Sequence, residues 1–139
     1  VGFGKGNNGM PEEVTIREDL QIIQVKSWGE ITTADFKKTL DEILRIRQAQ
    51  GLTNVFVDAT KVTSYPSTIS ILDFGSEAAR ALMDIQLAIS APPGKREDPE
   101  FFENITRNRG ANVRVFDTPD AALAWLPKEP NKAVEQTLG

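Results

Sequence analysis

The segment "VFVDATKVTSYPSTISILDF", from Val55 to Phe74, decides the fold because it begins as a buried strand and ends as a helix. Val55-Phe56-Val57 is a continuous apolar run of β-forming residues, which is typical of a central strand covered on both faces. Asp58 stands at the predicted exit of this strand, and a helical pattern of apolar residues follows Pro66. The segment therefore predicts one strand-to-helix unit of a mostly parallel sheet.

The same alternation continues on both sides of this segment. Strands are expected at 14–17, 20–26, 84–90 and 112–116, and helices at 32–51, 67–83, 99–109 and 118–126. The resulting order, β-β-α-β-α-β-α-β-α, predicts a single α/β domain with a mixed, mostly parallel sheet of about five strands and four helices. The first strand is expected to join antiparallel at an edge.

The ends of the chain differ in composition from this domain. Residues 1–13 are rich in Gly and Asn and predict a flexible arm, within which Met10 is a candidate genetic start. The domain is expected to span 14–126, and residues 127–139 to form a polar tail.

The composition excludes several types of catalytic and metal-binding side chain. The 139 residues carry a net charge of −4 and include no Cys and no His. Thiol and imidazole nucleophiles are therefore excluded, and we expect no metal site and no cofactor. The acidic balance argues against a nucleic-acid partner. No apolar run approaches the length of about 20 residues that spans a bilayer, and a cytoplasmic location is the default expectation.

Local signals place several helix ends. Thr32 and Asp35 form a capping-box pattern, and Gly51 is a C-terminal stop. Thr118 is expected to cap the last helix, with Pro119 in its first turn. The helix at 67–83 is expected to bury five apolar residues and to be interrupted at Gly75-Ser76. Those five residues are Ile69, Leu72, Ala79, Leu82 and Met83.

Three segments, in this order, resemble the SpoIIAA-like proteins of the STAS superfamily, which includes anti-sigma-factor antagonists and domains of sulphate transporters. "SWGEITTADFKKTL" at 27–40 is similar to the start of their first helix, and "NVFVDAT" at 54–60 to their central strand. "VRVFDTPDAALAWL" at 113–126 is similar to their closing strand and helix. The resemblance covers 14–126 and implies the same fold and a regulatory or binding role without catalysis, in a bacterial protein.

The resemblance also suggests a phosphorylation switch at Ser67. Aligned without a gap, Ser67 takes the position of the phosphoserine in the antagonist loop D-S-(S/T)-G. Pro66 replaces the family's Asp, however, and Ile69 replaces its Gly. The residues themselves favour a simpler role, in which Ser67 caps the helix that follows Pro66. Both interpretations of Ser67 remain open at the level of sequence.

SpoIIAA-like proteins are thought to hold nonpolar ligands between sheet and helices, or to touch membranes through a mobile helix. The helix at 67–83 is the corresponding element here, and its apolar stripe is wide. Tyr65, Ile71, Phe74 and Phe102 are therefore candidate ligand-binding residues. The same helix could instead contact an apolar protein partner, a membrane surface or a second copy of the chain.

Two carboxylates raise a third interpretation. Asp58 and Asp117 both follow predicted strands, and α/β folds place their sites at such positions. They are the candidates for a small carboxylate-dependent enzyme. The alternative is that Asp58 accepts hydrogen bonds from the amides near Thr60 and Lys61. We expect the non-catalytic binding domain.

Overall fold

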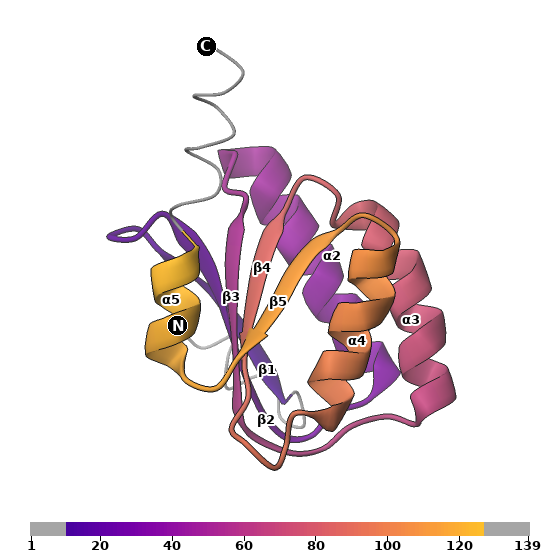
Figure 1. The fold of residues 1–139 in the computed structure, drawn as a ribbon. Helices are drawn as coiled ribbons and strands as arrows, with labels where there is room; N and C mark the ends of the chain where they lie inside the picture. Colours follow the sequence, from indigo (N-terminus) through magenta and orange to yellow (C-terminus); the bar gives the residue numbers. More distant parts are fainter. Residues whose placement is uncertain (1–10, 127–139) are drawn as a thin grey trace.

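A computed structural model describes residues 11–126, which form one five-stranded sheet with helices on both faces (Figure 1). The elements in chain order are β1 (Glu12–Arg17), β2 (Ile22–Glu30), α2 (Thr33–Gln50), β3 (Asn54–Ser64), α3 (Thr68–Ala81), β4 (Gln86–Ser90), α4 (Glu97–Asn108), β5 (Asn112–Phe116) and α5 (Pro119–Trp125). Residues 1–10 of the predicted arm, which include Met10, and the predicted tail at 127–139 lie outside the described residues.

The strands lie in the order β1-β2-β3-β4-β5. β1 pairs with β2 antiparallel, and the other three pairs are parallel. This arrangement confirms the predicted mixed sheet and its antiparallel edge strand. Because each crossover from β2 to β5 moves one strand along the sheet in the same direction, α2, α3 and α4 all cover one face (Figure 1). α5 lies on the opposite face.

The predicted helix ends are confirmed where a side chain or a glycine fixes them. The Oγ1 of Thr32 accepts from the Asp35 amide at 3.2 Å, and the Asp35 carboxylate accepts from the Thr32 amide at 2.8 Å. Gly51 ends α2 in the left-handed region, with φ of 74°. The Ala121 amide donates to Thr118 Oγ1 at 3.2 Å at the start of α5.

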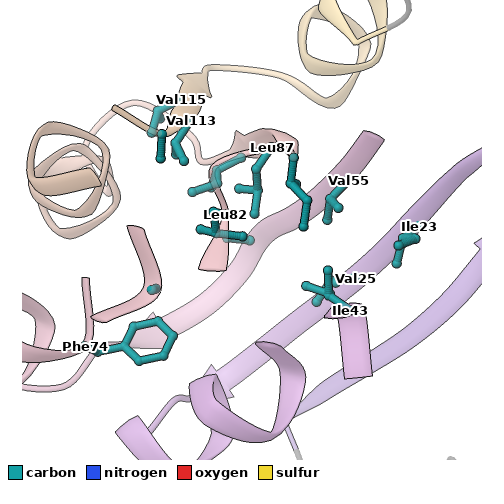
Figure 2. Close-up of a cluster of buried hydrophobic side chains, with 14 of the residues drawn as sticks. Ile23, Val25, Ile43, Val55, Phe74, Leu82, Leu87, Val113 and Val115 are labelled. Carbon is teal, nitrogen blue, oxygen red and sulfur yellow. The ribbon is translucent and has the colours of Figure 1, made fainter. Parts of the chain in front are cut away.

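Two clusters of buried side chains hold the layers together. The larger cluster lies between the sheet and helices α2–α4, and Figure 2 shows part of it, including Val25, Ile43, Phe74, Leu82 and Leu87. The smaller cluster lies on the α5 face and contains Ile22, Phe56, Ala88, Ala122 and Leu126. Successive strand residues alternate between the two faces, so β2, β3 and β4 contribute to both clusters.

The segment from Val55 to Phe74 departs from the prediction in its strand. β3 has 11 residues and continues to Ser64, so Asp58 lies within the strand and not at its exit. The extension forms because β2 also continues to Glu30, and Trp28 and Gly29 pair with Lys61 and Val62. Ala59 and Val62 are both buried although they are three residues apart, because the pairing of β2 with β3 shifts register between Lys26 and Trp28. This irregularity hid the longer strand from a search for simple alternation.

The orientation of α3 also differs from the prediction. Ile69, Leu72 and Met83 are exposed by 71%, 41% and 54%, and the helix buries Ile71, Phe74, Gly75 and Ala78 with the correctly predicted Ala79 and Leu82. The predicted interruption at Gly75-Ser76 is wrong, because α3 is continuous there. The Cβ that a side chain at Gly75 would add lies 3.0 Å from Ile105 Cγ2. Glycine therefore allows α3 and α4 to approach closely.

Several boundaries need correction. β2 spans Ile22–Glu30 and not 20–26, β4 begins at Gln86 and not at 84, and α3 ends at Ala81 and not at 83. β1 begins at Glu12, so part of the predicted arm belongs to the sheet. α4 begins at Glu97 and not at 99, with no side-chain cap at Arg96.

Candidate functional site: a cavity beneath three helices

A cavity of about 110 Å³ lies between the sheet and helices α2, α3 and α4. Its walls are mainly apolar side chains of the larger cluster. The strands contribute Val25, Val57, Ala59, Val62, Leu87 and Ile89, and the helices contribute Phe36, Leu40, Ile43, Ile71, Phe74, Ala78, Leu82, Pro99 and Phe102. A void of this kind in a core is a candidate binding site for a nonpolar molecule.

The four residues predicted to bind a ligand all line this cavity. Ile71 and Phe74 come from the first two turns of α3, Phe102 comes from α4, and Tyr65 comes from the segment that joins β3 to α3. The structure therefore brings them together around one space. Ligand binding by these side chains remains a prediction.

A row of three phenylalanine rings links the helices above the cavity. Phe36 of α2 stacks on Phe74 of α3 with ring centroids 5.2 Å apart, and Phe74 stacks on Phe102 of α4 at 5.9 Å. Phe74 is buried, and the two outer rings are half-buried. Because each ring comes from a different helix, the stack fixes the spacing of all three helices over the sheet.

Glu12 is a buried polar group in the cavity wall that was not predicted from the sequence. Glu12 at the start of β1 is only 8% exposed, and its carboxylate accepts a hydrogen bond from Ser27 Oγ at 2.7 Å and another from Thr39 Oγ1. Burial raises the pKa of Glu12, while the two hydroxyl groups partly offset that effect. The alternation of Glu12, Val14 and Ile16 along β1 was the available signal, since all three face the helices.

Asp98 is a second missed carboxyl group in the wall. It lies in the first turn of α4 and is half-buried, and burial raises its pKa. The pKa of Tyr65 is also raised, mainly by burial and then by the charges of Asp98 and Glu12. Tyr65, Asp98 and Glu12 all line the cavity.

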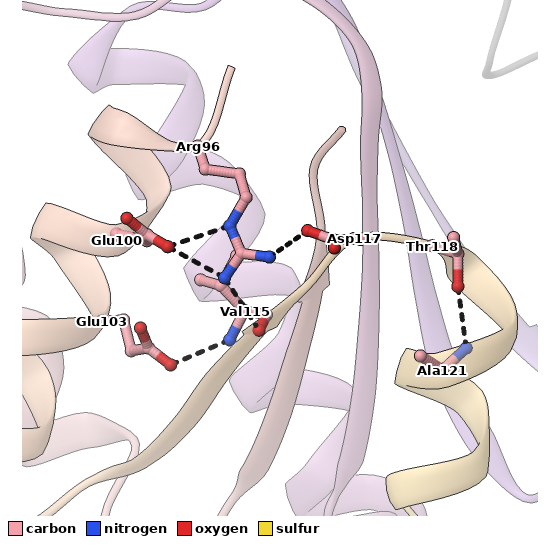
Figure 3. Close-up of polar contacts among 7 residues, drawn as sticks. All are labelled: Arg96, Glu100, Glu103, Val115, Asp117, Thr118 and Ala121. Atoms are coloured by element: carbon pink, nitrogen blue, oxygen red, sulfur yellow. Dashed lines mark hydrogen bonds and ion pairs between the residues drawn. The ribbon is translucent and has the colours of Figure 1, made fainter. Parts of the chain in front are cut away.

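An ion-pair network holds the start of α4 against β5 (Figure 3). Arg96 pairs with Glu100 at 2.9 Å and also with Asp117, which leaves β5. Glu103 accepts a hydrogen bond from the Val115 amide at 3.0 Å. These contacts fix α4, and with it Asp98 and Phe102, relative to the sheet.

The two carboxylates proposed for catalysis have other partners. Asp58 accepts hydrogen bonds from the Thr60 amide at 3.1 Å and from Thr60 Oγ1 at 2.6 Å, as the alternative interpretation of this residue predicted. Asp117 is paired with Arg96. Neither carboxylate lines the cavity.

Ser67 caps α3, as the simpler interpretation of this residue predicted. Its Oγ accepts a hydrogen bond from the Ser70 amide at 3.2 Å and donates to Ser70 Oγ at 3.0 Å. The side chain is exposed, two residues before the exposed Ile69 and five before the exposed Leu72.

Two structural properties bear on membrane contact and metal binding. Among residues 11–126, no helix is both long enough and apolar enough to cross a membrane. The same residues contain no group of three or more Asp or Glu side chains arranged to hold a metal ion.

Comparisons with known proteins identify the fold. No family model matches the chain, and no curated protein matches its sequence. Its structure is similar to that of an uncharacterised protein of the DUF3478 family, with a SpoIIAA-like fold, from Shewanella loihica PV-4. The TM-score is 0.55 at 18% identity, over 83% of this chain and 93% of the other. The chain therefore has a SpoIIAA-like fold, which confirms the predicted fold class and the fold that the resemblance implied.

Proposed function

We propose that this domain is a non-catalytic binding module that holds a small nonpolar molecule beneath α2, α3 and α4. The observation that carries the proposal is the cavity of about 110 Å³ with its apolar walls. A closely packed core leaves few voids of this size.

The cavity volume limits the size of the ligand. An engineered apolar cavity of about 150 Å³ stays dry and binds benzene or xenon. The cavity here is somewhat smaller, at about 110 Å³, so its ligand has an apolar part close to one benzene ring in size. The stacked rings of Phe36, Phe74 and Phe102 form part of its wall and favour a flat or aromatic group.

Native mass spectrometry of gently purified protein, before and after organic extraction, tests this proposal. We expect an extra mass that extraction removes. Ala78→Leu should abolish it, because Ala78 is buried in the cavity wall and a larger side chain fills the space. Ala121→Leu is the matched control, since Ala121 is exposed on α5. A bare chain mass in the wild type, together with no uptake of added apolar ligand, would contradict the proposal.

A second candidate function is supported by the outer surface of α3. Ile69 and Leu72 are exposed there, within five residues of the exposed Ser67 at the start of the same helix. An apolar partner, a membrane surface or a second copy of the chain would cover these side chains, and a phosphate on Ser67 would alter that contact. Ile69→Ser and Ser67→Asp should both weaken such association. A monomer in light scattering at high concentration would remove the homodimer, and unchanged partner binding by Ser67→Asp would remove the switch.

A further inference from the structure

The polar side chains of the cavity lie at one end. Ser27 is near the end of β2, Tyr65 follows β3, and Asp98 follows β4. Glu12 lies beside Ser27 in the β1–β2 ladder, and Thr39 of α2 donates to Glu12. These positions cluster at the carboxyl ends of the parallel strands, where α/β sheets bind ligands.

The other end of the cavity is apolar. Ile43 lies in the second half of α2, Leu82 follows the end of α3, and Leu87 lies at the start of β4. All three are therefore nearer the amino ends of the strands. The cavity therefore has two chemically different ends. It suits a molecule with an apolar body and a polar head, with the head toward Glu12, Tyr65 and Asp98.

The charge of the polar end selects the head group. Of the described residues that line the cavity, two are acidic and none is Lys or Arg. Each oxygen of Glu12 accepts one hydroxyl hydrogen, and a carboxylate oxygen has a second lone pair to offer. A ligand carboxylate would bring a third negative group without a hydrogen to donate, whereas an ammonium group would donate and neutralise charge.

The nearby helix N-termini do not reverse this preference. A free helix N-terminus attracts anions, but the starts of α2 and α4 already carry acidic side chains. Asp35 closes the capping box of α2, and Glu97, Asp98 and Glu100 occupy the first turn of α4. The positive ends of α2 and α4 are therefore compensated within the fold. The start of α3 has no acidic residue in its first turn, and there the Ser67 hydroxyl accepts the Ser70 amide.

From the two-ended cavity and its acidic lining, we infer that the ligand is a small apolar amine, whose ammonium head lies between Glu12, Asp98 and the Tyr65 hydroxyl. This inference rests on the proposed function and specifies its ligand class.

Four ligands that share one ring test the inference: toluene, benzyl alcohol, benzylamine and benzoate. Their binding to the full chain at pH 7 is measured by methyl NMR, using shifts of Ile71, Val62 and Ala78. We expect benzylamine to bind about tenfold or more tightly than benzoate, the effect of one well-formed charged contact. Glu12→Gln and Asp98→Asn should each reduce that ratio at least threefold, with toluene affinity unchanged. Glu97→Gln is the matched control, because Glu97 is exposed and does not line the cavity.

The outcomes separate the two claims. Binding of toluene with benzoate equal to or tighter than benzylamine would overturn the amine inference and leave the proposed function intact. A ratio that falls equally in Glu97→Gln and Asp98→Asn would also overturn it, because general charge would then explain the preference. Failure of all four ligands to bind would overturn both claims. Using Glu12→Gln and Asp98→Asn separately preserves the test if one variant does not fold.

Discussion

The two faces of the sheet are packed in different ways. On the α5 face, Phe56, Ala88 and Leu126 belong to a small cluster of buried apolar residues. On the three-helix face, a larger cluster encloses a cavity and a buried carboxyl group, Glu12. Voids and buried carboxyl groups both reduce stability. The comparison indicates that the α5 face serves folding, and that the three-helix face has a lower stability at the position of the proposed binding site.

The largest expected effect comes from breaking the α5 face. Leu126 is fully buried there, so Leu126→Ala should lower the free energy of unfolding by about 2–5 kcal/mol. Because Leu126 does not line the cavity, toluene affinity should be unchanged at a temperature where the variant is folded. Urea unfolding and an NMR titration measure the two quantities. A variant that loses affinity while still folded would show that the faces are not independent.

The next largest expected effect comes from an Ala→Leu substitution in the buried cluster on each face of the sheet. Ala78→Leu should raise the free energy of unfolding by about 0.5–2 kcal/mol, because it occupies the cavity. Ala122→Leu, at a fully buried position of the α5 cluster, should lower it by about 1–3 kcal/mol through overpacking. Thermal unfolding of both variants measures the two changes in stability. Equal losses would contradict the contrast between the faces.

The contact at Gly75 shows that part of the three-helix face is closely packed. Gly75→Ala gains about 1 kcal/mol of helix propensity but places its Cβ 3.0 Å from the Ile105 methyl group. Ile105 is buried and stiff at χ1, so overpacking costs about 1–3 kcal/mol. We expect a net loss of about 1 kcal/mol in urea unfolding. Ser76→Ala, on the exposed side of α3, controls for propensity, and a stabilised Gly75→Ala would disprove the tight contact.

The smallest effect concerns the buried carboxyl group. The folded-state pKa of Glu12 is raised by burial, with a contribution from Asp35, so folding favours the protonated form. The charged Glu12 carboxylate therefore destabilises the folded state. This loss of stability is absent below the pKa of Glu12 in the unfolded chain, about 4.3, and appears as the pH rises through its pKa in the folded protein. Glu12→Gln should therefore match the wild type near pH 4 and exceed its stability at pH 7, by less than about 1.5 kcal/mol.

Urea unfolding of both proteins across this pH range measures the difference. Glu13→Gln controls for the loss of one negative charge next to Glu12 in β1. A stability difference between Glu12→Gln and the wild type that narrows as the pH rises would contradict the assigned direction.

Local signals predicted much of the fold. Thr32, Ser67 and Thr118 act within three residues of their partners, so the sequence alone reveals them as caps. Gly51 ends its helix for an equally local reason. The alternation of strands and helices predicted a mostly parallel sheet, because two neighbouring parallel strands are usually connected by a helix.

The long-range features could not be predicted in the same way. The orientation of α3 depends on α4, which approaches at Gly75, and the apolar pattern of Ile69, Ile71 and Leu72 fits more than one rotation. The local sequence does not distinguish Glu12 from other polar strand residues. Its hydrogen bonds come from Ser27 in β2 and Thr39 in α2, which are distant in the sequence. The candidate ligand residues Tyr65, Ile71, Phe74 and Phe102 were identified by their apolar character, but the polar end of the cavity arises only from tertiary contacts.

The most direct test of the binding site is a toluene titration followed by methyl NMR, with the wild type, Ala78→Leu and Ala121→Leu compared. We predict saturable shifts of Ile71 and Val62 in the wild type and in Ala121→Leu, and none in Ala78→Leu, because only that substitution fills the cavity. The absence of saturable shifts in the wild type, or identical shifts in all three proteins, would contradict a ligand site beneath the three helices.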